Sequence, residues 1–313
     1  MEVILHIGAH RTGTTGFQDY IRRHREWLGH QKVGFWKPRR SQKSIHAGGA
    51  LQKHGAVLEP LSRDHEPRAS LQFDRMRRRG IEKLIVSDEN IVGTLRGNLR
   101  TGLLYASVGE RAAWFSRAFD FQISKIILCP RSLEEFWCTS VATAVVRGSP
   151  NPTDVKLKRI AASYRGWRDV IVDLAHAVPE AEIRILPFET FLGRPDMVLM
   201  RGADIEAPVE SARPWLDKTP DLPVLRRILR ERGEDVSNLP FGMGYWNPFT
   251  NEQHAGFREL YADDMMWLTA GADGLATLVE DRRRDSAGTT QPLATKEEGH
   301  NHEFKERRMA RPG

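Results

Sequence analysis

Short segments rich in apolar residues, many of them β-branched, recur along the first two thirds of the chain. They occupy residues 3–7, 81–86, 123–129 and 183–186, and a shorter extended piece lies at 33–36. Runs of this kind, without regular polar alternation, are typical of strands that are buried on both faces of a parallel sheet. The pattern therefore predicts four strands and one short extended piece.

Apolar residues at helical spacing separate these runs. Two of the helices open with a Ser-x-x-Glu pattern that predicts a capping box, Ser107 with Glu110 and Ser132 with Glu135. The alternation of strands and helices predicts an α/β fold of three layers, a central parallel β-sheet flanked by helices. The predicted helices span about 14–28, 70–79, 107–119, 132–147, 153–178 with a break at Gly166, 221–232, and a stretch that begins after Thr250.

A glycine-bounded loop follows the first strand, because residues 8–17 read GAHRTGTTGF. Backbone N–H groups at a helix start converge on anions, and glycine lets the backbone approach a phosphate closely. The loop differs from a standard nucleoside-triphosphate loop, since Thr14 stands in the lysine position and the cation, Arg11, lies two residues before Gly13. The candidate anion-binding residues are Arg11, Thr12, Gly13, Thr14 and Thr15.

Acidic residues follow the strand predicted at 81–86. Ligands bind at the carboxyl ends of strands in open α/β sheets, so Asp88 and Glu89 are candidate functional residues. Successive side chains point in opposite directions, and only one of the two should therefore face the site. A structural alternative for Glu89 is an ion pair with Arg96 or Arg100.

An arginine, Arg131, follows the strand predicted at 123–129. Thr139 lies eight residues later, with Ser140 beside it, and residues at this spacing share nearly the same helix face. A guanidinium fork and a hydroxyl group on one face can bind a phosphate together. A purely structural arginine at a helix start is disfavoured, because its charge opposes the helix dipole.

These motifs resemble the nucleotide site of the sulfotransferases that use 3′-phosphoadenosine 5′-phosphosulfate (PAPS). The phosphosulfate loop of that family reads Lys-Ser/Thr-Gly-Thr-Thr/Ser, and residues 11–15 match it with Arg11 in place of lysine. The family binds the 3′-phosphate with an arginine after a strand and a serine about two helical turns later, which Arg131 and Thr139 match. Gly16 departs from the family, many members of which have a tryptophan there.

A third segment extends the resemblance, which spans residues 3–265 and is carried by about a dozen positions. Residues 239–250 read LPFGMGYWNPFT and are similar to the family's Arg-Lys-Gly-x-x-Gly-x-Trp loop, with matches at Gly244 and Trp246. The Arg-Lys pair is missing before Gly242. The alternative for Trp246 is an aromatic plug at the edge of the core.

The resemblance implies a P-loop-type fold and an enzyme that moves a sulfuryl group from PAPS to a hydroxyl or amine acceptor, without a metal. Arg11 would stabilise the departing phosphate oxygen. A base must take the acceptor's proton, and the candidates are Glu89 and His46, the latter in a segment at 44–69 that is predicted to be a loop or a flap. The acceptor stays open among glycans, lipids and small molecules.

Three other functions compete with this one. A P-loop kinase or NTPase would use Thr15 and Asp88 to bind magnesium. A catalytically weak protein could keep the nucleotide site and bind without turnover. A nucleic-acid binder is disfavoured, because charge alone supports it.

The composition of the chain indicates which partners and which cellular compartment to expect. The net charge of +6 and the pI near 9.4 favour anionic partners, while 40% hydrophobic and 28% charged residues are ordinary for a soluble protein. Cys129 and Cys138 provide neither a disulfide framework nor metal-ligand spacing, which suits a reducing compartment. No apolar run approaches the ~20 residues of a membrane span, and a strand at residue 3 leaves no room for a signal peptide. We expect a cytoplasmic protein.

The chain is expected to form one domain over residues 1–284. From Asp285 it is rich in Gly, Thr, Gln and charged residues and poor in apolar ones, so 285–313 is predicted to be a disordered tail.

Overall fold

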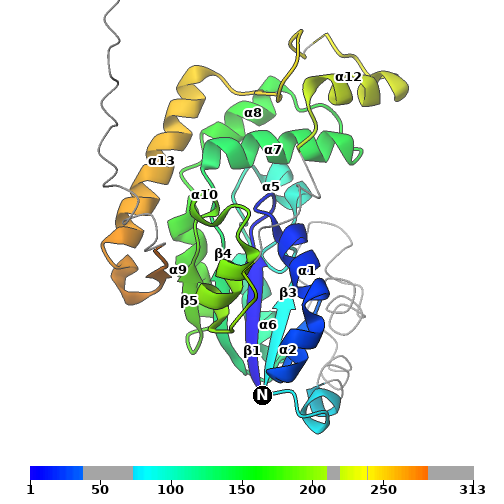
Figure 1. The fold of residues 1–313 in the computed structure, drawn as a ribbon. Helices are drawn as coiled ribbons and strands as arrows, with labels where there is room; N and C mark the ends of the chain where they lie inside the picture. Colours follow the sequence, from blue (N-terminus) through cyan, green and yellow to red (C-terminus); the bar gives the residue numbers. More distant parts are fainter. Residues whose placement is uncertain (38–72, 210–218, 238, 281–313) are drawn as a thin grey trace, which may run out of the picture. The chain divides into compact units, whose positions relative to one another are not determined.

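A single parallel sheet of six strands forms the centre of the part of the chain that the structure describes. The structure is a computed structural model that describes residues 1–37, 73–209, 219–237 and 239–280 (Figure 1). The sheet order is β2-β3-β1-β4-β5-β6. The strands are β1 (Glu2–Gly8), β2 (Val33–Trp36), β3 (Lys83–Ser87), β4 (Ile123–Leu128), β5 (Glu182–Ile185) and β6 (Thr277–Leu278).

The order of the strands creates a switch point at β1. This strand pairs with β3 on one side, with Ile4 opposite Ile85, and with β4 on the other, with Leu5 opposite Ile126. β2 and β3 thus lie on one side of β1, and β4, β5 and β6 lie on the other. Ligands of open α/β sheets bind at the carboxyl ends of the strands where the direction changes. That place lies at the ends of β1 and β4.

Helices cover both faces of the sheet, as Figure 1 shows for α1 and α2 on one side and for α6 and α9 on the other. The helices are α1 (Thr14–Arg23), α2 (Arg25–His30), α5 (Leu95–Thr101), α6 (Val108–Ala118), α7 (Leu133–Val146), α8 (Asp154–Ala161), α9 (Trp167–Ala177), α10 (Phe188–Phe191), α11 (Pro195–Met197), α12 (Leu222–Glu231) and α13 (Asn251–Thr269). A helical stretch at 73–78, a π-helical turn at Val198–Gly202 and a short 3₁₀ turn at Ala272–Gly274 complete the set.

Two separate hydrophobic cores form because neighbouring residues of a strand point to opposite faces. Ile4, Ile85 and Ile127 pack on one face against apolar side chains of α1, α2, α10 and α11. Leu5 and Val86 belong to the core on the other face, which includes side chains of α5, α6, α7, α9, α12 and α13. The predicted α/β fold with a central parallel sheet between two helical layers is confirmed.

Both predicted capping boxes are wrong, although helices do begin at these serines. Neither Ser107 nor Ser132 makes a side-chain capping hydrogen bond to α6 or α7. Glu135 instead accepts a hydrogen bond from Nη2 of Arg131 at 3.2 Å. The backbone N–H of Ser132 donates to Oε1 of Glu189 at 2.9 Å, so a carboxylate from another element takes the place of the local one.

Several boundaries differ from the sequence predictions. The helix expected over 153–178 is two helices, α8 and α9, with residues 162–166 between them, so the expected break is present. The sequence predicted neither α5, which is only seven residues long, nor the two-residue strand β6. The proposed flap at 44–69 and the tail at 285–313 lie outside the described residues. No helix in the described ranges has the length and apolar character to cross a membrane.

Candidate functional site

A pocket opens at the carboxyl ends of β1 and β4, where the sheet changes direction. It encloses about 1150 Å³ including its open mouth. Loop residues after β1, β3 and β4 line it, together with part of the segment at 188–198. The predicted site residues that line it are Arg11, Thr12, Gly13, Thr14, Thr15, Glu89 and Arg131.

The loop after β1 bends through positive φ angles at Gly8 (54°), Arg11 (68°) and Gly13 (78°). A Cβ atom at Gly8 would lie 2.4 Å from Oγ1 of Thr14, so only glycine fits the first of these positions. Arg11 is not glycine, and a residue in this region of backbone space is strained by about 1–3 kcal/mol. Strain of this kind persists only where the surroundings determine the conformation.

The start of α1 presents hydrogen-bond donors to this pocket. The backbone N–H groups of its first turn, from Thr14 to Gly16, have no partner within the helix and carry the positive end of its dipole. Oγ1 of Thr14 is buried and has no hydrogen-bond partner among the described residues. An anionic ligand at this place would satisfy both the N–H groups and the hydroxyl.

Arg11 and Arg131 are joined directly. Nη1 of Arg131 donates to the backbone carbonyl of Arg11 at 2.9 Å, and Nη2 of Arg11 donates to Oγ1 of Thr219 at 3.2 Å. Nε1 of Trp167 donates to the carbonyl of Arg131 at 2.8 Å, which fixes the backbone at the start of α7. The guanidinium of Arg131 lies 4.8 Å from the centre of the Phe188 ring. Two cations that are 120 residues apart in sequence therefore meet at one wall of the pocket.

Positive charge dominates the lining of the pocket. Four arginines line it, namely Arg11, Arg131, Arg147 and Arg194, against the one carboxylate of Glu89. Arg194 forms a two-point ion pair with the fully buried Asp196, at 3.0 and 2.9 Å, which compensates its charge. Arg131 also has an ion-pair partner, Glu135, at 3.2 Å. Four arginines against one carboxylate in the lining still favour an anionic ligand.

Glu89 and Asp88 point to different surroundings, as the alternation along the strand predicts. Glu89 lines the pocket. Asp88 is fully buried, and its Oδ1 accepts hydrogen bonds from the backbone N–H and from Nδ2 of Asn90, both at 2.9 Å. Asp88 does not line the pocket, so it is not placed to bind a metal there.

His10 is a pocket residue that the sequence analysis missed. The Tyr105 hydroxyl accepts the backbone N–H of His10 at 3.0 Å and is also hydrogen-bonded to Nδ1 of the imidazole, 2.8 Å away. Burial lowers the pKa of His10 to about 3, and the ring is therefore neutral near pH 7. Because Tyr105 is 95 residues away, no local pattern could have indicated this contact. The pair fixes the backbone directly before Arg11.

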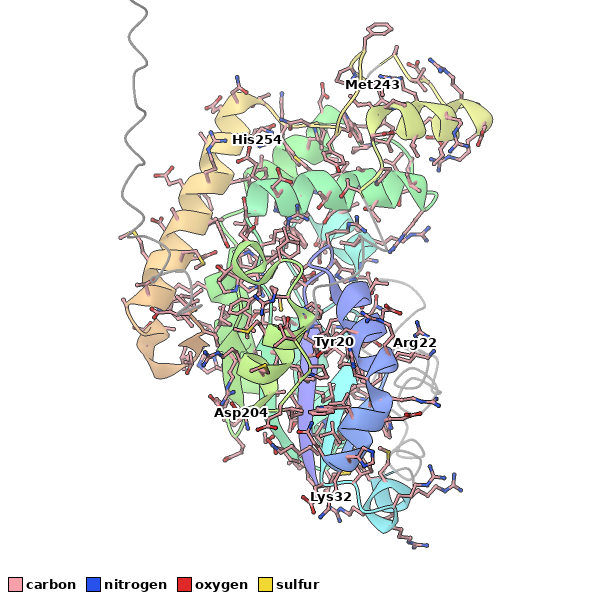
Figure 2. All side chains as sticks on the ribbon, in the orientation of Figure 1. Tyr20, Arg22, Lys32, Asp204, Met243 and His254 are labelled. Atoms are coloured by element: carbon pink, nitrogen blue, oxygen red, sulfur yellow. The ribbon has the colours of Figure 1, made fainter. Side chains whose placement is uncertain are left out.

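The structure does not bring the other predicted cofactor-binding residues to this pocket. The hydroxyl of Thr139 donates to the carbonyl of Glu135 at 2.7 Å, and Ser140 is fully buried, because this face of α7 packs into the protein. Trp246 belongs to the hydrophobic core, as its structural alternative predicted. Gly244 lies on an exposed loop that also contains Met243, which projects beyond α7 in Figure 2. His46 lies outside the described residues.

Among the described residues, no group of three or more His, Cys, Asp or Glu side chains could bind a metal ion. No protein-family model matches the chain, and no curated protein matches it either. The chemistry of the pocket therefore has to be derived from its own residues.

Proposed function

We propose that this protein is a PAPS-dependent sulfotransferase. The observation that carries the proposal is the 2.9 Å hydrogen bond from Arg131 to the Arg11 carbonyl, which joins two anion-binding motifs at one pocket. PAPS has anionic groups at two places, a phosphosulfate on its 5′ side and a phosphate on its 3′ side. The loop after β1 would bind the first and Arg131 the second. Nε of Arg131 is buried without a hydrogen-bond partner in the described part of the chain and could donate to that phosphate.

Transfer requires that negative charge on the departing phosphate oxygen is stabilised while the acceptor oxygen attacks sulfur. Arg11, the N–H groups at the start of α1 and the hydroxyls of Thr14 and Thr15 would stabilise this charge. Arg11 stays protonated and acts electrostatically, without giving up its proton. Glu89 would take the proton of the acceptor hydroxyl, with His46 as the alternative base.

The proposal includes two expectations about conditions. The reaction needs no metal, because the leaving phosphate is stabilised by the arginine and the helix start. We also place the reaction in the cytoplasm, where the thiols of Cys129 and Cys138, both free in the structure, would stay reduced.

Calorimetry with adenosine 3′,5′-bisphosphate, 5′-AMP and ATP tests the nucleotide site. We expect the bisphosphate to bind most tightly, because only it combines a 5′-phosphate with the 3′-phosphate that Arg131 would bind. Arg131→Ala should weaken bisphosphate binding by about 1.5–3 kcal/mol, the range for hydrogen bonds to charged groups. It should weaken 5′-AMP binding much less, because there only the lost bond to the Arg11 carbonyl contributes. Arg78→Ala, on an exposed residue before β3, is the matched control.

Equal affinity for 5′-AMP and the bisphosphate would contradict the assignment of the 3′-phosphate site. Turnover is then tested by mass spectrometry with PAPS and a panel of hydroxylated acceptors, with and without a chelator. Transfer that persists in the chelator supports the sulfotransferase, whereas ATP-dependent transfer that requires magnesium would select a P-loop kinase. Tight bisphosphate binding without transfer to any acceptor would select a catalytically weak binding protein.

A further inference from the structure

A second pocket, strongly basic, lies between α5 and α8. Its lining contains the cations Arg96, Arg100, Lys156 and Arg159 and no carboxylate. Within the described ranges, none of these four side chains forms an ion pair. Figure 1 shows α5, α7 and α8 grouped at the same end of the sheet, beyond the carboxyl ends of the strands.

Two of these cations are fixed by the backbone, not by opposite charge. Nη2 of Arg96 donates to the carbonyl of Arg147 at 3.2 Å, and Nη2 of Arg159 donates to the carbonyl of Arg100 at 2.6 Å. These bonds orient the guanidinium groups but leave their positive charge uncompensated. A concave surface with four such charges favours a ligand that brings several negative charges.

Residues close in sequence line the basic pocket and the candidate active site at two places. On α5, Leu95 lines the active-site pocket and the next residue, Arg96, lines the basic pocket. At the end of α7, Arg147 lines the first and Ser149 lines the second. The two pockets are therefore close enough that a chain molecule with one group beside Glu89 could reach the basic pocket.

We propose that the basic pocket binds the anionic groups of an extended acidic polysaccharide, one hydroxyl of which lies beside Glu89 as the sulfuryl acceptor. This proposal rests on the proposed function and names the acceptor class of the same site. A polysaccharide combines hydroxyl groups with repeated carboxylates or sulfates, which matches a hydroxyl-directed site beside an anion-binding one. Single-stranded nucleic acids are bound largely by aromatic side chains that stack on bases, and the described lining of the basic pocket contains no aromatic residue.

Binding of fluorescently labelled heparin, measured by anisotropy at several salt concentrations, tests the proposal. The variant R100Q/K156Q removes two charges from the basic pocket and keeps side chains that favour helices. The matched control, R75Q/R78Q, removes two charges from an exposed helical stretch before β3, at the opposite end of the sheet. Neutral dextran and a single-stranded oligothymidylate are the comparison ligands.

We expect R100Q/K156Q to bind heparin about five- to tenfold more weakly than the control. The logarithm of the heparin association constant should also depend less steeply on the logarithm of the salt concentration. Compared with the natural chain, the slope should be smaller in magnitude by about two, because two fewer counterions are released. Its affinity for adenosine 3′,5′-bisphosphate should not change. With PAPS and an acidic polysaccharide as acceptor, the KM for the polysaccharide should rise while kcat stays the same.

Equal loss of heparin affinity in the two double variants would overturn the proposal, since net charge alone would then explain binding. Tighter and more pocket-dependent binding of the oligothymidylate than of heparin would also overturn it, in favour of a nucleic-acid surface. Heparin binding is measured without nucleotide, so it is independent of the proposed chemistry. Pocket-dependent heparin binding without bisphosphate binding or transfer would overturn the sulfotransferase function and leave the polysaccharide site standing.

Discussion

Arg11 is the residue on which the proposed chemistry depends most directly. Its backbone adopts a left-handed conformation with φ 68°, which is unusual for a residue with a side chain. Its carbonyl and its guanidinium are both bound, by Arg131 and by Thr219. The surroundings therefore place the cation at the end of β1 before any ligand is present, and such preorganisation is what stabilises a developing charge.

Arg11→Ala should lower kcat by about 10²–10³ while changing bisphosphate affinity much less, because loss of one preorganised donor acts mainly on the transition state. Arg11→Lys should retain much of the activity, since it keeps the charge. Steady-state kinetics with PAPS and calorimetry with the bisphosphate provide the two values. If Arg11→Ala raises only the KM for PAPS, the arginine binds the ground state and has no special role in transfer.

Glu89→Gln should abolish turnover and spare bisphosphate binding, because it keeps the shape of the side chain and removes its basicity. The measurement is the transfer rate under saturating PAPS, with Glu180→Gln, an exposed site between α9 and β5, as the control. Near-normal turnover of Glu89→Gln, together with an inactive His46→Ala, would assign the base to the histidine.

Tyr105 holds the loop after β1 through its contacts with His10, which is 95 residues away in the sequence. Tyr105→Phe leaves the His10 N–H and the imidazole Nδ1 without their partner in a buried place, so we expect a loss of about 1–3 kcal/mol in the free energy of unfolding. Bisphosphate affinity should fall as well, because the residue before Arg11 is released. Urea unfolding and calorimetry measure the two effects. Tyr164→Phe is the control, since Tyr164 is 92% exposed, and an equal effect there would contradict the prediction.

At the scale of elements, a carboxylate from α13 caps α9. Oδ2 of Asp264 accepts the N–H of Trp167 at 2.6 Å, and Oδ1 accepts the N–H of Arg168 at 3.2 Å. A Cβ atom at Gly166 would lie 2.4 Å from Oδ2, so the preceding residue has to be small. Asp264, about a hundred positions later in the sequence, therefore caps α9 together with the local Asp169, whose Oδ2 accepts the N–H of Gly166 at 2.9 Å.

Burial raises the pKa of Asp264 to about 6, from an ordinary value of 3.8, although the two helix N–H groups act in the opposite direction. Because the folded pKa lies above the unfolded one, the folded protein binds this proton more tightly. The stability that this group contributes is present below about pH 4 and is lost as pH rises through about 6.

Asp264→Asn should therefore flatten the fall in unfolding free energy between pH 4 and 6, relative to the natural chain. Urea unfolding at a series of pH values measures the slope. Asp120→Asn is the control, at an exposed position at the end of α6. Parallel curves for the natural chain and for Asp264→Asn would show that the carboxyl group ionises normally.

At the scale of the whole molecule, the central strands and the edge strands differ in how many neighbours they have. β1 is paired on both sides over most of its length and contributes to both cores. β6 has two residues and pairs only with β5. The opening free energy of a strand follows its burial and pairing.

Hydrogen exchange should therefore be slowest in β1 and β4, whose amides would exchange only on global unfolding, and much faster in Thr277–Leu278. Exchange measured by mass spectrometry on peptides from each strand tests this order. Protection of the β6 peptide equal to that of β1 would contradict it and would indicate that the edge opens only with the whole sheet.

Features that depend on neighbours along the chain could be predicted from the sequence. Apolar runs indicated β1, β3, β4 and β5, because a strand between two helical layers has no polar face. The glycine pattern around Arg11 indicated the sharply bent loop between β1 and α1, and the alternation after β3 indicated that Asp88 and Glu89 differ in direction. Arg131 was found by its position after a strand.

Which of these features lie side by side depends on the packing of the whole fold. The crossover connections place β1 between β3 and β4, so the loops that carry Arg11 and Arg131 become neighbours. The packing of α7 turns Thr139 and Ser140 away from the candidate active site. Trp246 is buried in the hydrophobic core. The contact of His10 with Tyr105 and the basic pocket between α5 and α8 join residues that are tens of positions apart. A local pattern carries no information on such contacts, because they depend on how complete elements pack.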